Sequence, residues 1–107
     1  MPISEIEVAA LARRVAEGAL VIDVREPDEY AAGHVPGAVL IPLATVPDNL
    51  DRFRSDKPTY VICQSGGRSM RACEYAAGEG YDVVNVAGGT GAWITSGNDV
   101  VVGESPT

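Results

Sequence analysis

Short apolar runs that alternate with helical segments are the feature that most constrains the fold of this chain. Four runs are rich in β-branched residues and too short for helices, as expected of strands buried on both faces of a parallel sheet. They span residues 19–24, 38–41, 59–62 and 83–86. Helical patterns alternate with them near residues 28–32, 46–53, 69–79 and 91–95. This alternation predicts an α/β fold in which helices cover both faces of the sheet.

A further helix is predicted near the N-terminus, over about residues 5–17. Apolar side chains recur there at helical spacing, at Val8, Leu11, Ala12 and Val15. Ser4 and Glu7 match a capping box, and Ile3 is placed to pack against Val8 as a hydrophobic staple. The sequence therefore predicts a helix that begins directly after Ser4.

Length and charge limit the classes of protein that remain. We expect one domain over residues 1–101 and a polar, flexible tail over residues 102–107, because 107 residues leave no room for a second domain. The net charge of -7 disfavours binding to nucleic acid or to an anionic membrane surface. No apolar stretch approaches the ~20 residues of a membrane span. The first residues carry acids where a secretory signal carries Lys or Arg, so we expect a cytoplasmic protein with reduced thiols.

The candidate active site is a strand, a loop and a helix around Cys63. The predicted strand over 59–62 ends just before Cys63, and two glycines in the following loop permit unusual backbone angles. The loop residues are Gln64, Ser65, Gly66, Gly67, Arg68 and Ser69. Backbone N–H groups in such a turn, together with the start of a helix, stabilise an anion at its centre. We therefore expect Cys63 to have a pKa below the usual ~8.5 and to act as a nucleophile.

Local charge and position indicate what this site binds. Between Lys57 and Cys73 the sequence contains three basic residues and no acid, in a chain that is acidic overall. Ligands of parallel α/β sheets bind at the carboxyl ends of the strands, where Cys63 is expected to lie. These observations predict an anionic substrate.

The remaining cysteine and the single histidine are expected to be structural. Cys73 falls in the predicted helix in line with small apolar residues, which favours a core position over a catalytic one. His34 lies in a segment rich in turn residues and is expected to make a structural hydrogen bond. Two cysteines and one histidine are too few soft ligands for zinc, so we expect no metal and no cofactor.

Three motifs resemble those of rhodanese-like domains. The first consists of DVREPDEY at residues 23–30, GHVPGA at 33–38 and IPL at 41–43. The second is the loop CQSGGRS at 63–69, and the third is GGTGAW at 88–93. The resemblance extends from Ile3 to about Val101, which is nearly the whole chain.

The resemblance implies a five-stranded parallel sheet flanked by helices and a sulfurtransferase activity. Cys63 matches the cysteine that carries sulfane sulfur as a persulfide, from a small donor such as thiosulfate to a thiol or cyanide acceptor. An acceptor protein such as thioredoxin would be a partner. The residues that match the substrate-binding loop are Gln64, Ser65, Gly66, Gly67, Arg68 and Ser69, and the resemblance implies a supporting ion pair between Asp23 and Arg25.

Two other functions compete with this interpretation. A cysteine-based phosphatase or arsenate reductase of the same fold also places a thiolate and an arginine before a helix. The phosphatases use a Cys-x5-Arg loop, whereas Cys63 and Arg68 form Cys-x4-Arg. A non-catalytic binding module of the same family commonly lacks the cysteine.

The sequence departs from the family pattern at one loop position that concerns the sulfur donor. Gln64 is neutral where thiosulfate-using members often have Arg, which makes thiosulfate a less expected natural donor.

Overall fold

The computed structural model describes residues 3–107 and contains one five-stranded sheet in which every strand pair is parallel. The strands follow the order β1-β5-β4-β2-β3. Their bounds are β1 Glu5–Ile6, β2 Val21–Asp23, β3 Val39–Leu40, β4 Thr59–Ile62 and β5 Val83–Val86. The central strand is β4, so the residue that follows it, Cys63, lies at the middle of the carboxyl edge. The predicted α/β class with a five-stranded parallel sheet is confirmed.

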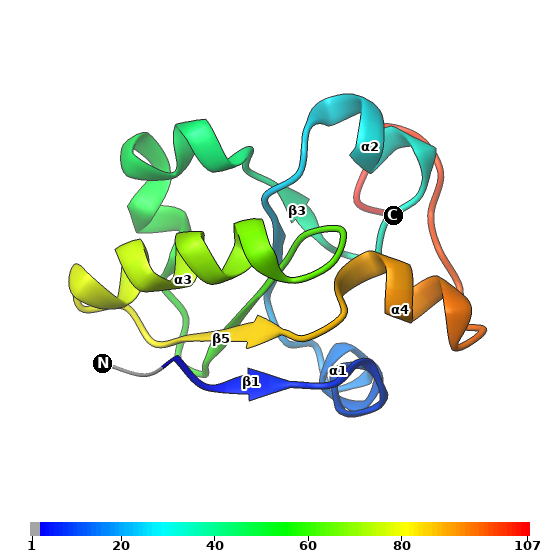
Figure 1. Ribbon diagram of the computed structural model, residues 1–107, viewed down its shortest axis with the longest axis horizontal. Helices are drawn as coiled ribbons and strands as arrows, with labels where there is room; N and C mark the ends of the chain where they lie inside the picture. The colour runs from blue at the N-terminus through cyan, green and yellow to red at the C-terminus, as the bar shows by residue number, and fades with distance from the viewer. Residues whose placement is uncertain (1–2) are drawn as a thin grey trace.

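Helices cover both faces of the sheet, as predicted (Figure 1). Their bounds are α1 Val8–Ala16, α2 Pro27–Ala32, η1 Leu43–Phe53, α3 Gly67–Gly78 and α4 Gly89–Thr95. The segment η1 is a 3₁₀ helix that contains Pro47 and is kinked at Asn49. Buried residues of α1 and α4 pack on one face, and those of α3 and η1 pack on the other. Among residues 3–107, no helix has the length and apolar character needed to cross a membrane.

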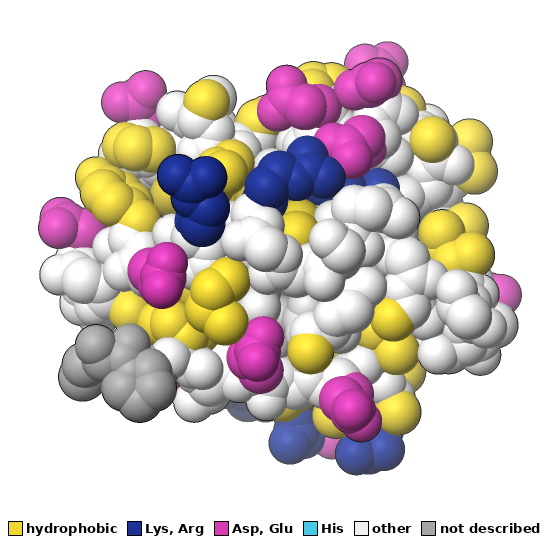
Figure 2. Space-filling view, in the orientation of Figure 1, with side chains coloured by type: hydrophobic (Ala, Val, Ile, Leu, Met, Phe, Trp, Pro, Cys, Tyr) yellow, Lys and Arg dark blue, Asp and Glu magenta, His cyan; other side chains and the backbone are white. Residues whose placement is uncertain are grey.

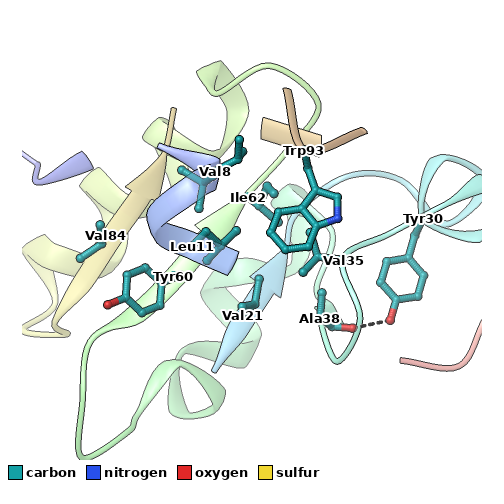
Figure 3. Packing of buried hydrophobic residues seen from close by; sticks show 11 residues of the cluster. Val8, Leu11, Val21, Tyr30, Val35, Ala38, Tyr60, Ile62, Val84 and Trp93 are labelled. Carbon is teal, nitrogen blue, oxygen red and sulfur yellow. Dashed lines mark hydrogen bonds between the residues drawn. The ribbon is translucent and has the colours of Figure 1, made fainter. Parts of the chain in front are cut away.

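Side chains alternate between the two faces along β4, which fixes the side on which the candidate nucleophile lies. Tyr60 and Ile62 belong to the cluster that includes residues of α1 and α4, part of which Figure 3 shows. Val61 and Cys63 belong to the cluster of α3 and η1. This is the period of two expected of a strand. Cys63 therefore faces α3, the helix that follows its own loop.

The strands β4 and β5 have the predicted bounds, and the N-terminal helix is present, but its predicted start and capping are wrong. Residues Glu5–Ile6 form the edge strand β1 on β5, and α1 begins only at Val8. The predicted capping box is absent, because Glu7 is the N-cap of α1 and makes no side-chain cap hydrogen bond. The predicted staple is absent too, because Ile3 packs with the α3 cluster and Val8 with the α1 cluster. Pairing with β5 outweighs the local helical signal, since it satisfies backbone groups that an exposed helix start would leave to water.

The polar tail runs back to the segment after α2 (Figure 1). His34 and Val101 form an isolated antiparallel bridge, and the Gly37 N–H donates to the Pro106 carbonyl at 2.9 Å. The His34 ring makes the structural hydrogen bonds that the sequence predicts, through Nδ1 to the Tyr30 carbonyl (2.8 Å) and through Nε2 to the Ser105 carbonyl (2.9 Å). The domain boundary after residue 101 and the flexibility of the tail stay predictions.

Candidate active site

The loop that follows β4 folds the backbone around the sulfur of Cys63. Cys63 is 1% exposed, and α3 begins only four residues later, at Gly67. Gly66, the N-cap of α3, has φ of 112°, a conformation that residues with a side chain rarely adopt. This turn brings the Gly66 N–H within 3.1 Å of the Cys63 Sγ. The glycine predicted to permit an unusual backbone angle is therefore the residue that aims a donor at the sulfur.

Several donors converge on this sulfur. The Ser69 hydroxyl donates to Cys63 Sγ at 3.3 Å from the first turn of α3. Burial raises the pKa of the Cys63 thiol, but hydrogen bonds from the Ser69 hydroxyl and from the backbone N–H groups of Ser69, Gly66 and Ser65 lower it by more. The net pKa is below the ordinary value, in the direction that the sequence predicts. A thiolate at this position is the nucleophile that the site offers.

The start of α4 supports the same loop from the other side. The Thr90 N–H donates to the Cys63 carbonyl at 2.9 Å, and the Gly91 N–H donates to the Gln64 carbonyl at 3.0 Å. Gly89 has φ of 59°, and a Cβ there would lie 2.6 Å from the Gln64 carbonyl oxygen and even closer to that of Cys63. The motif at 88–93 thus holds the backbone of the candidate nucleophile. Sequence reasoning assigned it no role, although a second glycine pair directly before a helix is a signal that could have found it.

The predicted ion pair between Asp23 and Arg25 is present and fully buried. The Arg25 Nη2 lies 2.8 Å from Asp23 Oδ2 and 2.9 Å from the Gly33 carbonyl oxygen. The remaining guanidinium nitrogen, Nη1, donates to Gln64 Oε1 at 3.3 Å. The pair therefore holds the side chain of Gln64, and Arg25 makes no hydrogen bond to the Cys63 sulfur within residues 3–107.

The second arginine beside the loop, Arg68, is also paired with an acid. Its two terminal nitrogens lie 2.7 and 2.9 Å from the two carboxylate oxygens of Glu29 in α2. The hydrogen bond to Arg68 is the largest cause that lowers the pKa of Glu29 to about 2, and the same bond raises the pKa of Arg68. Figure 2 shows basic side chains lying against acidic ones between α2 and the start of α3.

The positive window read along the sequence is neutralised in space only at Arg68, by Glu29 of α2. Arg71 forms no ion pair among residues 3–107, and Asp23 neutralises Arg25, which lies outside the window. The sequence argument for an anionic substrate counted only neighbours along the chain. Glu29 was missed because 39 positions separate it from Arg68 and nothing local connects them.

Asn85 is a further residue that sequence reasoning missed. It is buried in the apolar strand β5, and its Nδ2 donates to Glu5 Oε2 at 2.8 Å and to the Gly66 carbonyl at 3.2 Å. It thus ties the loop to β1. A polar residue inside the run VVNV is the signal that could have found it, because a buried amide needs partners.

Cys73 is a core residue, as predicted. It is 0% exposed in the middle of α3 and packs in the same cluster as Ala72 and Ala76. Burial, supported by the nearby acids Glu5 and Glu74, raises the pKa of its thiol to about 12. Cys73 is therefore not activated at neutral pH.

Known proteins resemble this chain over most of its length. The model of the family described as Rhodanese-like domain matches residues 7–96. A sulfurtransferase of Allochromatium vinosum is 35% identical over 105 residues, which cover 95% of this chain and 98% of that protein. The thiosulfate sulfurtransferase GlpE of Pseudomonas entomophila is 42% identical over 85 residues, which cover 78% of this chain and 77% of that protein. The crystal structure of a rhodanese-related protein from Thermoplasma volcanium superimposes with a TM-score of 0.86 at 33% identity, covering 92% of this chain and 98% of that one.

Proposed function

The chain belongs to the rhodanese-like domain family, and we propose that it is a sulfurtransferase that carries sulfane sulfur as a persulfide on Cys63. The Cys63 thiolate attacks the outer sulfur of a donor, the S–S bond of the donor breaks, and the donor's leaving group departs with the electron pair. For thiosulfate that leaving group is sulfite. An acceptor thiolate or cyanide then attacks the terminal sulfur of the persulfide and releases the Cys63 thiolate, so no external oxidant or reductant is needed.

The hydrogen-bond donors around Cys63 Sγ are the observation that carries this proposal. The Gly66 N–H and the Ser69 hydroxyl lie within 3.3 Å of the sulfur, and the pKa of the thiol is lowered although the residue is buried. Such donors stabilise the thiolate that attacks the donor and the thiolate that leaves in the second step. We assign Gln64, Ser65, Gly66, Gly67, Arg68 and Ser69 to the loop that binds the transferred sulfur, with Asp23 and Arg25 in support.

The contacts of Arg68 make the phosphatase alternative less favourable. A phosphatase needs the loop arginine to bind the equatorial oxygens of a phosphoryl group. In this chain both terminal nitrogens of Arg68 are occupied by Glu29, and the Cys63 loop has four residues between Cys and Arg. The donors aimed at the sulfur also favour chemistry over a role in binding alone.

We propose a small-molecule sulfur donor and a thiol acceptor, which includes an acceptor protein such as thioredoxin. GlpE, a relative, is named for its use of thiosulfate. We propose the cytoplasm as the site of action, because a persulfide carrier must keep its thiol reduced between turnovers.

Intact-protein mass spectrometry tests the proposal. After incubation with thiosulfate or an organic persulfide, the protein should gain the mass of one sulfur atom, which cyanide or dithiothreitol removes. The modified peptide should contain Cys63. The Cys73→Ser variant should still gain the sulfur, and the Cys63→Ser variant should not. A gain that maps to Cys73, or no gain with any donor, would refute the assignment.

A further inference from the structure

Two arginines lie beside the Cys63 loop, at what we call its mouth, and each is paired with an acidic side chain. Arg25 is buried against Asp23, and Arg68 is bound through both terminal nitrogens by Glu29. The Arg68 and Glu29 side chains are 37% and 30% exposed, so this second pair is partly open to solvent beside the loop that follows Cys63. A small anionic donor therefore meets a guanidinium whose charge is already balanced by a carboxylate that accepts from both of its terminal nitrogens.

Glu29 is fixed in this position by its own helix. Its Oε1 accepts a hydrogen bond from the Glu26 N–H at 3.0 Å as well as from Arg68. Because its pKa is about 2, the carboxylate stays ionised across the physiological range. Glu29 is thus in the ionised form that pairs with Arg68 at neutral pH.

We propose that Glu29 is a specificity-determining residue that, by holding Arg68, selects against dianionic donors such as thiosulfate and favours an organic persulfide. This inference rests on the sulfur-transfer function proposed for Cys63. A persulfide R–S–SH carries at most one negative charge at its sulfur end, so its binding is weakened less than that of thiosulfate when Glu29 neutralises Arg68.

The corresponding reaction is balanced without another reagent. The Cys63 thiolate attacks the outer sulfur of R–S–SH, a new S–S bond forms to Cys63, and the S–S bond of the donor breaks. The thiolate R–S⁻ leaves with the electron pair, and the proton remains on the transferred sulfur. The products are the Cys63 persulfide and a thiol carrier that can be reloaded.

The charge at the mouth can be measured without any sulfur transfer. Iodoacetate and iodoacetamide alkylate the same thiolate, and they differ in one negative charge. The ratio of their rates at Cys63 therefore reports the local potential, because the ionised fraction of the thiol cancels. In Glu29→Gln this ratio should rise about three- to fivefold, as expected for one partly exposed charge, and the rise should shrink in high salt.

Asp28 provides the matched control, because it is an exposed acid of the same helix that forms no ion pair among residues 3–107. Asp28→Asn makes the same change in net charge and should leave the ratio within about twofold of the wild type, as an exposed unpaired charge has little effect. Glu29→Asp keeps the charge and should resemble the wild type. Arg68→Gln leaves Glu29 without its partner and should lower the ratio, which tests the proposal even if Glu29→Gln folds poorly.

Donor kinetics complete the test. Relative to the wild type, Glu29→Gln should raise kcat/KM for thiosulfate about three- to fivefold through a lower KM, and should change kcat/KM for 2-hydroxyethyl persulfide less. Unchanged alkylation ratios and unchanged thiosulfate KM in a folded Glu29→Gln would overturn this inference alone. A wild-type protein that gains no sulfur from either donor would instead overturn the proposed function and, with it, the assignment of donor class.

Discussion

The two cysteines occupy buried positions in the same hydrophobic cluster, yet their acidities move in opposite directions. Cys63 is 1% exposed and Cys73 is 0% exposed, and both pack on the α3 side of the sheet. The pKa of Cys63 is lowered, whereas burial raises the pKa of Cys73 to about 12. Burial alone therefore does not set the direction in which the pKa of a thiol moves in this protein; the supply of hydrogen-bond donors does.

Backbone geometry explains the difference in donor supply. Cys73 lies inside α3, where each N–H is used by the helix and none is free for a thiol. Cys63 lies before the helix, where the turn through Gly66 and the first turn of α3 leave N–H groups that can face the sulfur. The same helix thus lowers the pKa of the cysteine before its start and offers no N–H donor to the cysteine in its interior.

Replacing each cysteine by serine should give the largest difference between the two positions. Cys63→Ser should lose sulfurtransferase activity on the order of a thousandfold or more, because the hydroxyl cannot carry a persulfide. Cys73→Ser should keep most of its activity, measured as thiocyanate formed from thiosulfate and cyanide. Similar losses in two folded variants would show that the donor supply around Cys63 does not mark the nucleophile.

Adding a methyl group behind the Cys63 loop should have the next largest effect. Gly89→Ala forces a Cβ against the Cys63 and Gln64 carbonyl oxygens at a positive φ. We expect a loss of about 2–4 kcal/mol in the free energy of unfolding and a loss of activity. Gly78→Ala in α3 is the matched control, since nothing lies within 4 Å of its Cβ position, and it should be neutral or gain up to about 1 kcal/mol. Urea unfolding measures both, and an equally stable Gly89→Ala would show that α4 does not hold the loop rigidly.

The sequence predicts the fold best where strands are central. The bounds of β4 and β5 are as expected, because these runs are fully buried and their composition reflects that burial. The N-terminus was misjudged because residues 5–6 are an edge strand of two residues, with no run long enough to show a strand period. Their conformation is decided by β5, whose paired residues lie 80 positions away, and no local pattern records that partner.

The sequence predicts the site residues that are consecutive in the chain, but not those that the fold brings in from other elements. Cys63, Gly66 and Ser69 could be identified because loop, glycine and helix start are consecutive. Glu29 and Gly89 could not be assigned roles, since each acts on the loop from another element. The pairing of Arg68 was missed for the same reason, because a count of charges along the sequence omits Glu29, which lies on another element.

Removing one hydrogen-bond donor should raise the pKa of Cys63 toward that of Cys73. Ser69→Ala deletes the hydroxyl that lies 3.3 Å from Cys63 Sγ, so the pKa of the thiol should rise. Below that pKa the thiolate fraction falls, and alkylation by iodoacetamide at neutral pH should slow several-fold, with the pH–rate profile displaced to higher pH. Arg68→Ala should displace the profile in the same direction but less, because Arg68 acts from a distance and is paired with Glu29. A Ser69→Ala profile equal to that of the wild type would show that the backbone donors suffice by themselves.

The smallest expected effect concerns the ion pair between Arg68, in the Cys63 loop, and Glu29, in α2. Within residues 3–107, no ion pair of this kind involves the residues next to Cys73. The pKa of Glu29 is lowered from 4.5 to about 2 in the folded protein, chiefly by Arg68. A lowered folded pKa means that the ion pair stabilises the fold above pH 4.5 and that this stabilisation is lost as the pH falls toward about 2. Because both side chains are about one-third exposed, water screens the pair, and we expect it to contribute only about 0.5–1 kcal/mol to the free energy of unfolding.

Glu29→Gln should therefore be less stable than the wild type by that amount at pH 7 and equally stable near pH 2, whereas the stability difference of Asp28→Asn should not disappear in this way. Urea midpoints measured across this range decide the matter: a difference that persists in acid would mean that Glu29 stabilises α2 through its hydrogen bond to Glu26, and that the loop is not held by charge.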